Sequence, residues 1–324
     1  MRHEIEAGFL ATAQDAAIAA ARTIGQGKKK HSDHVATEAM RTAMDSVTMR
    51  GRIVIGEGER DEAPMLYIGE EVGSMSPGSP EVDIAVDPLE GTNLCAHGTA
   101  GSIAVIACAP RGGLLHAPDV YLEKIVVGPR ARGAIAIEAS PAENLKEIAK
   151  SLHRAVTDLL IVILDRPRHE TLIAQVRAAG ARIQLIGDGD LAPGVSSALR
   201  GTGVHAVMGA GGAPEGVLTA AAMRCLGGEI QGRLMPARDG DVERLAKAGF
   251  DDLGRVFKTE DLAPSDEIVF CATGVTDGSL LRSVRFFGGG CRTHSLLMRS
   301  KGPRHIRFVD QTHIDDDYVG ALRF

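Results

Sequence analysis

Residues 83–99 read DIAVDPLEGTNLCAHGT. The apolar, β-prone run at 82–86 predicts a buried strand. Because proline cannot donate to a sheet ladder, we expect this strand to end at Asp87-Pro88. An acidic loop with a glycine follows, and open α/β sheets usually build their sites in loops that leave the strand ends. The stretch therefore predicts a functional site in a loop of an α/β fold.

The loop carries two carboxylates, Asp87 and Glu90, followed by Gly91 and Thr92. Closely spaced carboxylates in a buried loop repel each other unless a positive charge lies between them. Oxygen ligands of this kind suit Mg²⁺ or Mn²⁺. On these residues alone, an acidic turn with a capping threonine is an equally good interpretation.

The composition is that of a soluble globular protein. The chain has 324 residues, of which 44% are hydrophobic and 24% charged, with a formal net charge of -6. This length allows one large two-part fold or two domains. The negative charge and the low aromatic content of 3% disfavour nucleic acid as a partner.

The cysteines and the apolar runs indicate the compartment. The five cysteines are scattered and never occur in C-x-x-C spacing, which disfavours a disulfide framework and a zinc site. The N-terminus has no signal-like apolar core, and no run reaches the length of a membrane span. We therefore expect a cytoplasmic protein without a membrane partner.

The N-terminal region predicts two helices. Residues 6–24 show apolar positions at helical spacing, and a second helix is expected with Ser32 and Asp33 as candidate N-caps. The lysine cluster 28–30 before it suits a phosphate or the edge of a metal site, but a solvated loop is more common.

A glycine- and acid-rich run, GEGERDEAP at 56–64, follows a predicted short strand at 52–55. Glycines allow a close approach of the backbone to a ligand. The run lacks the third glycine of a dinucleotide fingerprint, since Asp61 stands there. Pro64 suits a first helical position and predicts a helix over 65–72.

From about residue 141 strands and helices alternate, which predicts right-handed crossovers in a mostly parallel sheet. Three turns at consecutive strand ends carry polar groups: an arginine-rich turn at 165–169, an acidic turn at 187–190 and a glycine-rich turn at 209–215. Arginine suits phosphate, carboxylates accept from sugar hydroxyls, and bare amides suit an anion. Together the three turns predict a sugar-phosphate site. The polar, alternating stretch 292–299 predicts an edge strand.

The motifs resemble a known family. DPLEGT at 87–92 resembles the D-P-x-[DE]-G-[ST] signature of the metal-dependent, lithium-sensitive sugar phosphatases. Its glutamate resembles the class II fructose-1,6-bisphosphatases of bacteria, and GEGERDEAPMLYIGE at 56–70 is the most specific match to them. GQGKKKHSD at 25–33 is similar to their N-terminal motif, and the resemblance covers nearly the whole chain.

The resemblance implies an α/β fold, a layered α-β-α-β-α sandwich of the sugar phosphatase type with two subdomains. Residues 1–140 would form a metal-binding catalytic subdomain, and residues 141–324 a sugar-phosphate-binding α/β subdomain. A homodimer or homotetramer is also implied.

The resemblance also implies roles for individual residues. Metal ligands would be Asp33, Glu57, Asp87, Glu90 and Glu215. Catalytic residues would be Lys29, Asp61 and Thr92. Substrate would be bound by Glu90, Gly91, Thr92, Tyr121, Arg166, Pro167, Arg168, Asp188, Gly189, Asp190 and Gly212. Without the resemblance, Tyr121 reads as a core residue and Glu215 as a favourable acid in a first helical turn.

The expected activity is hydrolysis of fructose 1,6-bisphosphate with Mn²⁺ or Mg²⁺, in gluconeogenesis or the reductive pentose phosphate pathway. Sedoheptulose 1,7-bisphosphate is a possible second substrate. An inositol-phosphate or nucleotide 3'-phosphatase of the same superfamily is an alternative, and a non-catalytic sugar-phosphate-binding regulator is another. A nicotinamide-dependent dehydrogenase is disfavoured, because no complete dinucleotide fingerprint is present.

Overall fold

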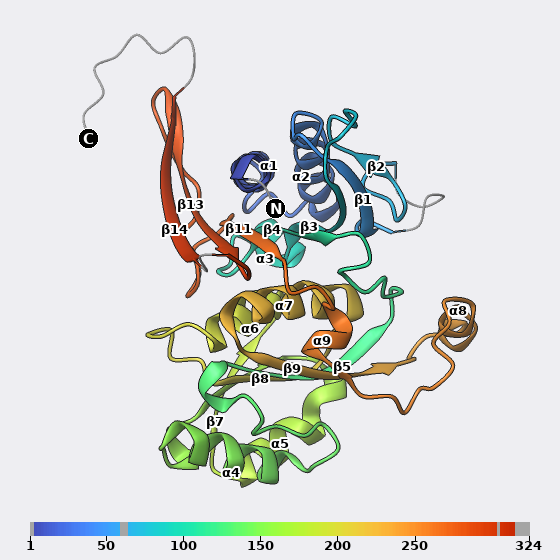
Figure 1. Cartoon of the computed structure of the whole chain (residues 1–324). Coiled ribbons are helices and arrows are strands. Elements are labelled where there is room, and N and C mark those ends of the chain that lie inside the picture. Colours follow the sequence, from blue (N-terminus) through green and yellow to red (C-terminus); the bar gives the residue numbers. More distant parts are fainter. Residues whose placement is uncertain (1–2, 59–63, 303–304, 315–324) are drawn as a thin grey trace.

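The computed structural model describes residues 3–58, 64–302 and 305–314, which form an α/β fold built on two sheets (Figure 1). Helices α1 (His3–Ala21) and α2 (Lys29–Met44) cover one face of the first sheet. Helices α6 (Leu191–Ser197) and α7 (Ala213–Leu226) lie between the two sheets. The far face of the second sheet is covered by α4 and α5, which span Pro141–Leu152 and Glu170–Ala178.

Among the described residues the first sheet has eight strands, in the order β12-β13-β11-β4-β3-β1-β2, with β14 paired to β13. In the part of the chain that the structure describes, only β1 and β3 are parallel neighbours in this sheet. Since β13 lies between β14 and β11, the edge-strand prediction for 292–299 is wrong. The strands are β1 (Arg50–Ile55), β2 (Glu71–Val72), β3 (Glu81–Glu90), β4 (Ile103–Pro110), β11 (Val269–Gly274), β12 (Arg285–Phe287), β13 (Gly290–Arg299) and β14 (His305–Ile314).

The central strand β3 does not end at Asp87-Pro88, as the proline had led us to expect. It pairs with β4 as far as Asp87, the register then shifts, and pairing resumes at Glu90 opposite Ile103. The irregularity accommodates Pro88, which has no N–H to donate, and lets the strand continue past it. Both acids therefore lie on the sheet and not in a free loop.

The second sheet has the order β10-β9-β5-β8-β6-β7 in the described part of the chain. Strand β6 is parallel to β7 and β8, but β5 is antiparallel to both β8 and β9. The sheet is therefore mixed, and the prediction of a mostly parallel sheet is wrong. Its strands are β5 (Tyr121–Val127), β6 (Leu160–Leu164), β7 (Arg182–Ile186), β8 (Ala206–Gly212), β9 (Glu229–Met235) and β10 (Phe257–Lys258).

The strands of the two sheets are not separated by one boundary in the sequence at residue 140. Strand β5 precedes that point but belongs to the second sheet, whereas β11 to β14 return to the first sheet. The short helix α8 (Asp241–Lys247) connects β9 to β10 within the second sheet, and α9 (Thr259–Leu262) lies in the connection from β10 to β11 of the first sheet.

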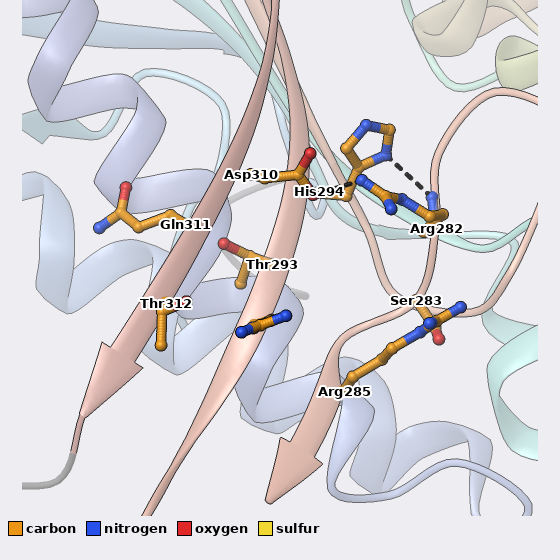
Figure 2. A pocket seen from close by; sticks show the side chains of 9 residues that line it. Arg282, Ser283, Arg285, Thr293, His294, Asp310, Gln311 and Thr312 are labelled. Atoms are coloured by element: carbon orange, nitrogen blue, oxygen red, sulfur yellow. Dashed lines mark hydrogen bonds and ion pairs between the residues drawn. The ribbon is translucent and has the colours of Figure 1, made fainter. Parts of the chain in front are cut away.

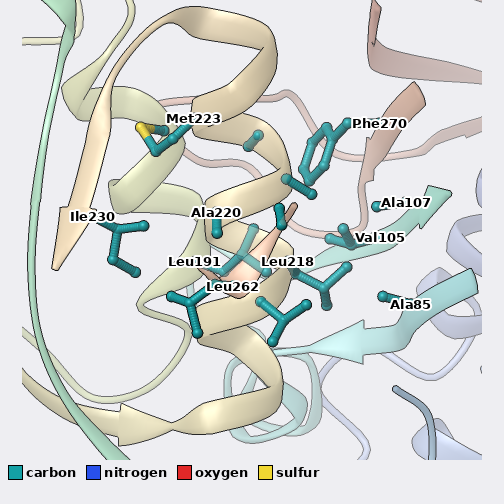
Figure 3. Close-up of a cluster of buried hydrophobic side chains, with 14 of the residues drawn as sticks. Ala85, Val105, Ala107, Leu191, Leu218, Ala220, Met223, Ile230, Leu262 and Phe270 are labelled. Atoms are coloured by element: carbon teal, nitrogen blue, oxygen red, sulfur yellow. The ribbon is translucent and has the colours of Figure 1, made fainter. Parts of the chain in front are cut away.

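Helix α7 joins the two sheets through a shared hydrophobic core (Figure 3). Leu218, Ala220 and Met223 on this helix are fully buried, and Phe270 of β11 and Ile230 of β9 belong to the same cluster. A helix that is apolar on nearly all sides must be covered on all sides. The core therefore fixes the start of α7 against the end of β3, where the acids lie.

Two local predictions near β1 are wrong. Residues 65–72 form turns and the short strand β2, not a helix, and Leu66 has a positive φ of 54°. The Glu70 carboxylate accepts from the Leu66 N–H and from Arg41, which stabilises this turn. Helix α2 begins at Lys29, so Ser32 and Asp33 lie inside its first turns instead of capping it. None of the described helices has the length and apolar character needed to cross a membrane.

Candidate active site

Three acids converge where β3 meets the start of α7. One ligand oxygen from each of Asp87, Glu90 and Glu215 lies within 4.8 Å of the others. Glu90 is buried, and its Oε1 accepts a hydrogen bond of 3.2 Å from the Leu191 N–H. The Oε2 atom of Glu215 is buried and has no hydrogen-bond partner within the described chain. Such an orphaned carboxylate oxygen, beside two further acids, is what a hard divalent cation would satisfy.

The acids strongly perturb each other. Burial raises the pKa of Asp87 and of Glu90 well above the usual values, and for Glu90 the neighbouring charge of Asp87 raises it further. Burial also raises the pKa of Glu215, although the charge of Lys124 opposes this effect. Carboxylates in this arrangement either hold protons or bind a cation, and a cation converts them to full anions.

A second acid pair lies beside the first. Asp33, in the first turns of α2, shares a hydrogen bond with Glu57, which follows β1 directly. Burial and the nearby Asp33 charge raise the pKa of Glu57 to about 8. Because the charges of both acids also raise the pKa of Asp87, the two groups form one continuous electrostatic site.

The candidate catalytic residues are placed differently. Thr92 begins α3 (Thr92–His97), and its Oγ1 donates to the Leu89 carbonyl over 3.0 Å. Lys29 is exposed at the start of α2, four residues before Asp33 and thus on the same side of the helix. Asp61 lies outside the described residues.

A cavity of about 220 Å³ opens beside the acids. It brings together eight of the eleven predicted substrate residues, whereas Gly91, Thr92 and Pro167 are not in its lining. Its lining consists of Glu90, Asp119, Tyr121, Leu164, Arg166, Arg168, Asp188, Gly189, Asp190, Gly211, Gly212, Glu215 and Arg238. The lining therefore combines carboxylates with three arginines, the two kinds of group that a phosphate ester bound between a metal site and a cationic clamp requires.

The cationic side is organised around Tyr121. The Arg168 guanidinium lies 4.5 Å from the centre of the tyrosine ring, and Arg238 lies 5.5 Å from it. Arg238 also pairs with Asp119 at 3.2 Å. Stacking on an aromatic ring restrains a guanidinium without using its N–H groups, so those that are not bonded to other protein groups stay available to an anion.

The acidic turn has a structural function in addition to facing the cavity. Asp188 Oδ2 accepts from the Asn93 N–H at 3.3 Å and from its side-chain amide at 2.7 Å. Arg166 lies 3.9 Å from the same carboxylate. These contacts tie the loop after β7 to the start of α3, and Gly189 packs against Gly91 at this junction. Pro167 starts the short helix η3 (Pro167–His169) and is exposed.

Gly212 is required by the position of the Glu215 carboxylate. A Cβ atom at residue 212 would lie 1.9 Å from Glu215 Oε2. Any side chain there would push the carboxylate out of the acid cluster. The glycine predicted as a substrate contact therefore also shapes the candidate metal site.

A larger cavity of about 320 Å³ lies elsewhere, between β12, β13 and β14 (Figure 2). Arg282 donates from its backbone to His294 Nδ1 over 3.1 Å and pairs with Asp310. Asp310 is the only carboxylate in its described lining. It therefore lacks the groups for metal-assisted hydrolysis, and the smaller cavity is the candidate active site.

Comparison with known proteins identifies the family of the chain. The family model for bacterial fructose-1,6-bisphosphatase, glpX-encoded, matches residues 3–313. The chain belongs to this family. It is 49% identical to the D-fructose 1,6-bisphosphatase class 2/sedoheptulose 1,7-bisphosphatase of Synechococcus sp. (strain JA-2-3B'a(2-13)), over 98% of this chain and 97% of that protein. The protein of the same name from Synechocystis sp. (strain ATCC 27184 / PCC 6803 / Kazusa) is 49% identical over 94% of both chains.

Sequence reasoning missed two cations in the candidate active site. Lys124 is 1% exposed, and its Nζ lies 2.8 Å from Asp190 Oδ1. A lysine in the centre of an apolar strand was a usable signal, because a buried ammonium requires a partner. Arg238 follows β9 in an ordinary polar stretch and offered no such signal.

Proposed function

We propose that this chain hydrolyses fructose 1,6-bisphosphate to fructose 6-phosphate and phosphate, and that it also acts on sedoheptulose 1,7-bisphosphate. Membership of the class II family supports the reaction class. The observation that carries the proposal is one cavity whose lining includes Glu90 and Glu215 of the acid cluster together with Arg166 and Arg168. The acids suit the ester that is cleaved, and the arginines suit the phosphate that stays.

Mn²⁺ or Mg²⁺ is the cofactor we propose. Asp33 and Glu57 would hold one ion, and Asp87, Glu90 and Glu215 the other. The partnerless Glu215 Oε2 and the all-oxygen donor set support this choice. When bound, the ions supply Lewis acidity and lower the pKa of water.

The side chains around the ions would then have separate roles in the reaction. Asp61 with Thr92 would orient or deprotonate the attacking water, and Lys29 would offset charge at the scissile phosphate. The guanidinium groups would hold the distal phosphate, and Asp188 and Asp190 would accept from sugar hydroxyls. Positioning and charge stabilisation supply most of the rate enhancement in phosphoryl transfer.

The wider assignment rests on the family and on the fold. The two sheets with three helical layers support the α-β-α-β-α sandwich of the sugar phosphatases. We assign most of the metal-binding function to residues 1–140 and most of the sugar-phosphate binding to residues 141–324, with Glu215 and Tyr121 each contributed across this division. All five cysteines are buried thiols, in keeping with the cytoplasm. A homodimer or homotetramer serving gluconeogenesis or the reductive pentose phosphate pathway completes the proposal.

The test is phosphate release from fructose 1,6-bisphosphate with Mn²⁺ or Mg²⁺, for the wild type and for Asp87→Ala. Since a metal ion contributes several kcal/mol of transition-state stabilisation, we expect a loss of about 10²- to 10³-fold or more. The seven-carbon bisphosphate and an inositol phosphate are assayed in parallel. Release from the inositol phosphate alone would favour the alternative phosphatase. A folded, metal-binding protein without any release would favour a sugar-phosphate-binding regulator.

A further inference from the structure

Strand β8 loses its neighbour before it reaches the cavity. It pairs with β6 only at Ala206 and Val207, while on its other side it pairs with β5 as far as Gly212. Beyond Val207, the backbone N–H and C=O groups of β8 that point toward the β6 side therefore have no strand partner in the described part of the chain. Buried backbone groups need hydrogen bonds from another source.

Two consecutive side chains supply these bonds at Ala210. The His169 Nε2 atom accepts from the Ala210 N–H over 2.8 Å. Arg168 donates to the Ala210 carbonyl through Nε at 3.1 Å and Nη2 at 2.8 Å. The backbone N–H and C=O of Ala210 are thus both hydrogen-bonded by side chains of η3. These bonds replace those that a longer β6 would have made.

The contacts of His169 define its tautomer. Its Nδ1 lies 2.7 Å from the Leu164 carbonyl, which can only accept, so Nδ1 carries the proton. Its Nε2 faces the N–H of Ala210, which can only donate, so Nε2 is unprotonated. The ring is 3% exposed, and burial lowers its pKa, in keeping with a neutral imidazole.

Gly209 makes room for this ring. A Cβ atom at Gly209 would lie 2.9 Å from His169 Nε2, and the residue has a φ of 131°. That backbone conformation is one that side chains rarely adopt. The strand therefore carries glycine at the point where the imidazole packs against it.

We propose that His169 is a positioning residue for Arg168. It fixes the end of β6 against β8, so that the Arg168 guanidinium lies over Tyr121 and faces the cavity. This inference deepens the proposed function and rests on it, since Arg168 is assigned there to the distal phosphate. The role of His169 is indirect, because it contacts backbone and does not line the cavity.

The test is a double-mutant cycle with His169→Phe and Arg168→Ala, read as KM and kcat on fructose 1,6-bisphosphate. Phenylalanine keeps the ring but removes both hydrogen bonds. We expect KM to rise about tenfold with kcat changed less than about threefold, the pattern of lost ground-state binding. In the Arg168→Ala background the second change should raise KM less than about twofold. His169→Gln, which keeps an acceptor for the Ala210 N–H, should recover part of the loss.

Equal effects of His169→Phe in both backgrounds would overturn the inference, as would a fall in kcat at unchanged KM. Long-range ¹H–¹⁵N spectra of the wild type at about pH 7 give a readout independent of turnover and of variant folding. An Nδ1-protonated ring supports the inference, and a proton on Nε2 overturns it. Wild-type protein that shows this tautomer but releases no phosphate would contradict the proposed function and leave the His169 geometry in place.

Discussion

The carboxyl groups of Asp33 and Glu57 share a hydrogen bond, although one comes from α2 and the other follows β1. Two carboxyl groups can bond in this way only when a proton lies between them. Burial, the Asp33 charge and this bond raise the pKa of Glu57 to about 8, so the pair holds a proton at neutral pH. A cation bound by this pair must displace that proton.

Metal binding is therefore expected to release a proton and to strengthen with pH. Below the raised pKa of Glu57, the affinity for Mn²⁺ should increase up to about tenfold per pH unit, and it should level off above about pH 8. Calorimetric titration at pH 7 in two buffers of different ionisation enthalpy measures the released protons directly. Equal apparent enthalpies in the two buffers would contradict the prediction.

The stability of the metal-free protein should fall as pH rises. Glu57 has a usual pKa of 4.5 and a folded value of about 8, so between these values the folded state binds more protons than the unfolded state. The free energy of unfolding then decreases with pH across this window. Thermal unfolding in the presence of a chelator measures the effect. Glu57→Gln cannot ionise and should show a smaller decrease, and an unchanged slope would assign the effect to other groups.

Gly212→Ala should weaken metal binding without unfolding the protein. The new Cβ would lie 1.9 Å from the present position of Glu215 Oε2, so the carboxylate must move away from Asp87 and Glu90. We expect Mn²⁺ affinity to fall about ten- to a hundredfold, in the range seen when ligand orientation is disturbed. The matched control is Gly288→Ala, where a Cβ meets no atom within 4 Å. Equal metal affinity in both variants would show that Glu215 is not a ligand.

Lys124→Met should destabilise the protein more than the loss of an exposed ion pair would. The change leaves the Asp190 carboxylate, only 7% exposed, without its ammonium partner at 2.8 Å. Breaking a buried pair on one side costs about 3–5 kcal/mol of unfolding free energy. Urea denaturation measures this loss. The double variant Lys124→Met, Asp190→Asn removes the uncompensated charge and should recover a large part of it; no recovery would show that the pair is not the cause.

The cysteines should be unreactive in the folded protein. All five are buried, and burial raises the pKa of the Cys95, Cys108 and Cys271 thiols above the usual value. Thiolates, not thiols, react with aromatic disulfide reagents. We expect slow labelling of the native protein and rapid labelling of five groups in guanidinium chloride. One fast native thiol would indicate local opening at that cysteine.

The sequence predicted the acids better than it predicted their surroundings. Asp87 and Glu90 were identifiable because a carboxylate-glycine motif directly follows an apolar strand. Their placement on one strand across Pro88 was not, since the register shift depends on pairing with β4. Local propensity contains no information about a partner strand.

The cationic side of the candidate active site could also be predicted from the sequence only in part. The arginines of the turn after β6 were recognisable by type, and the family resemblance assigned them to substrate. The packing that holds them was not recognisable, because β5 lies antiparallel between β8 and β9 and brings Tyr121 to the cavity and Lys124 to Asp190 in its lining. Regular strand and helix alternation predicts parallel neighbours, and it cannot report an earlier strand inserted among later ones.

The interrupted path of the chain through the first sheet has a consequence for synthesis. Strand β4 pairs with β11, and the whole of the second sheet lies between them in sequence. On the ribosome the second sheet can therefore close while β4 still has an open edge. Helix α1 can complete its packing only after β13 has been synthesised, because its Glu6 pairs with Arg299 of that strand. The nascent enzyme is thus expected to acquire its sugar-phosphate wall as a folded unit first, and its complete acid cluster only after the last strands emerge.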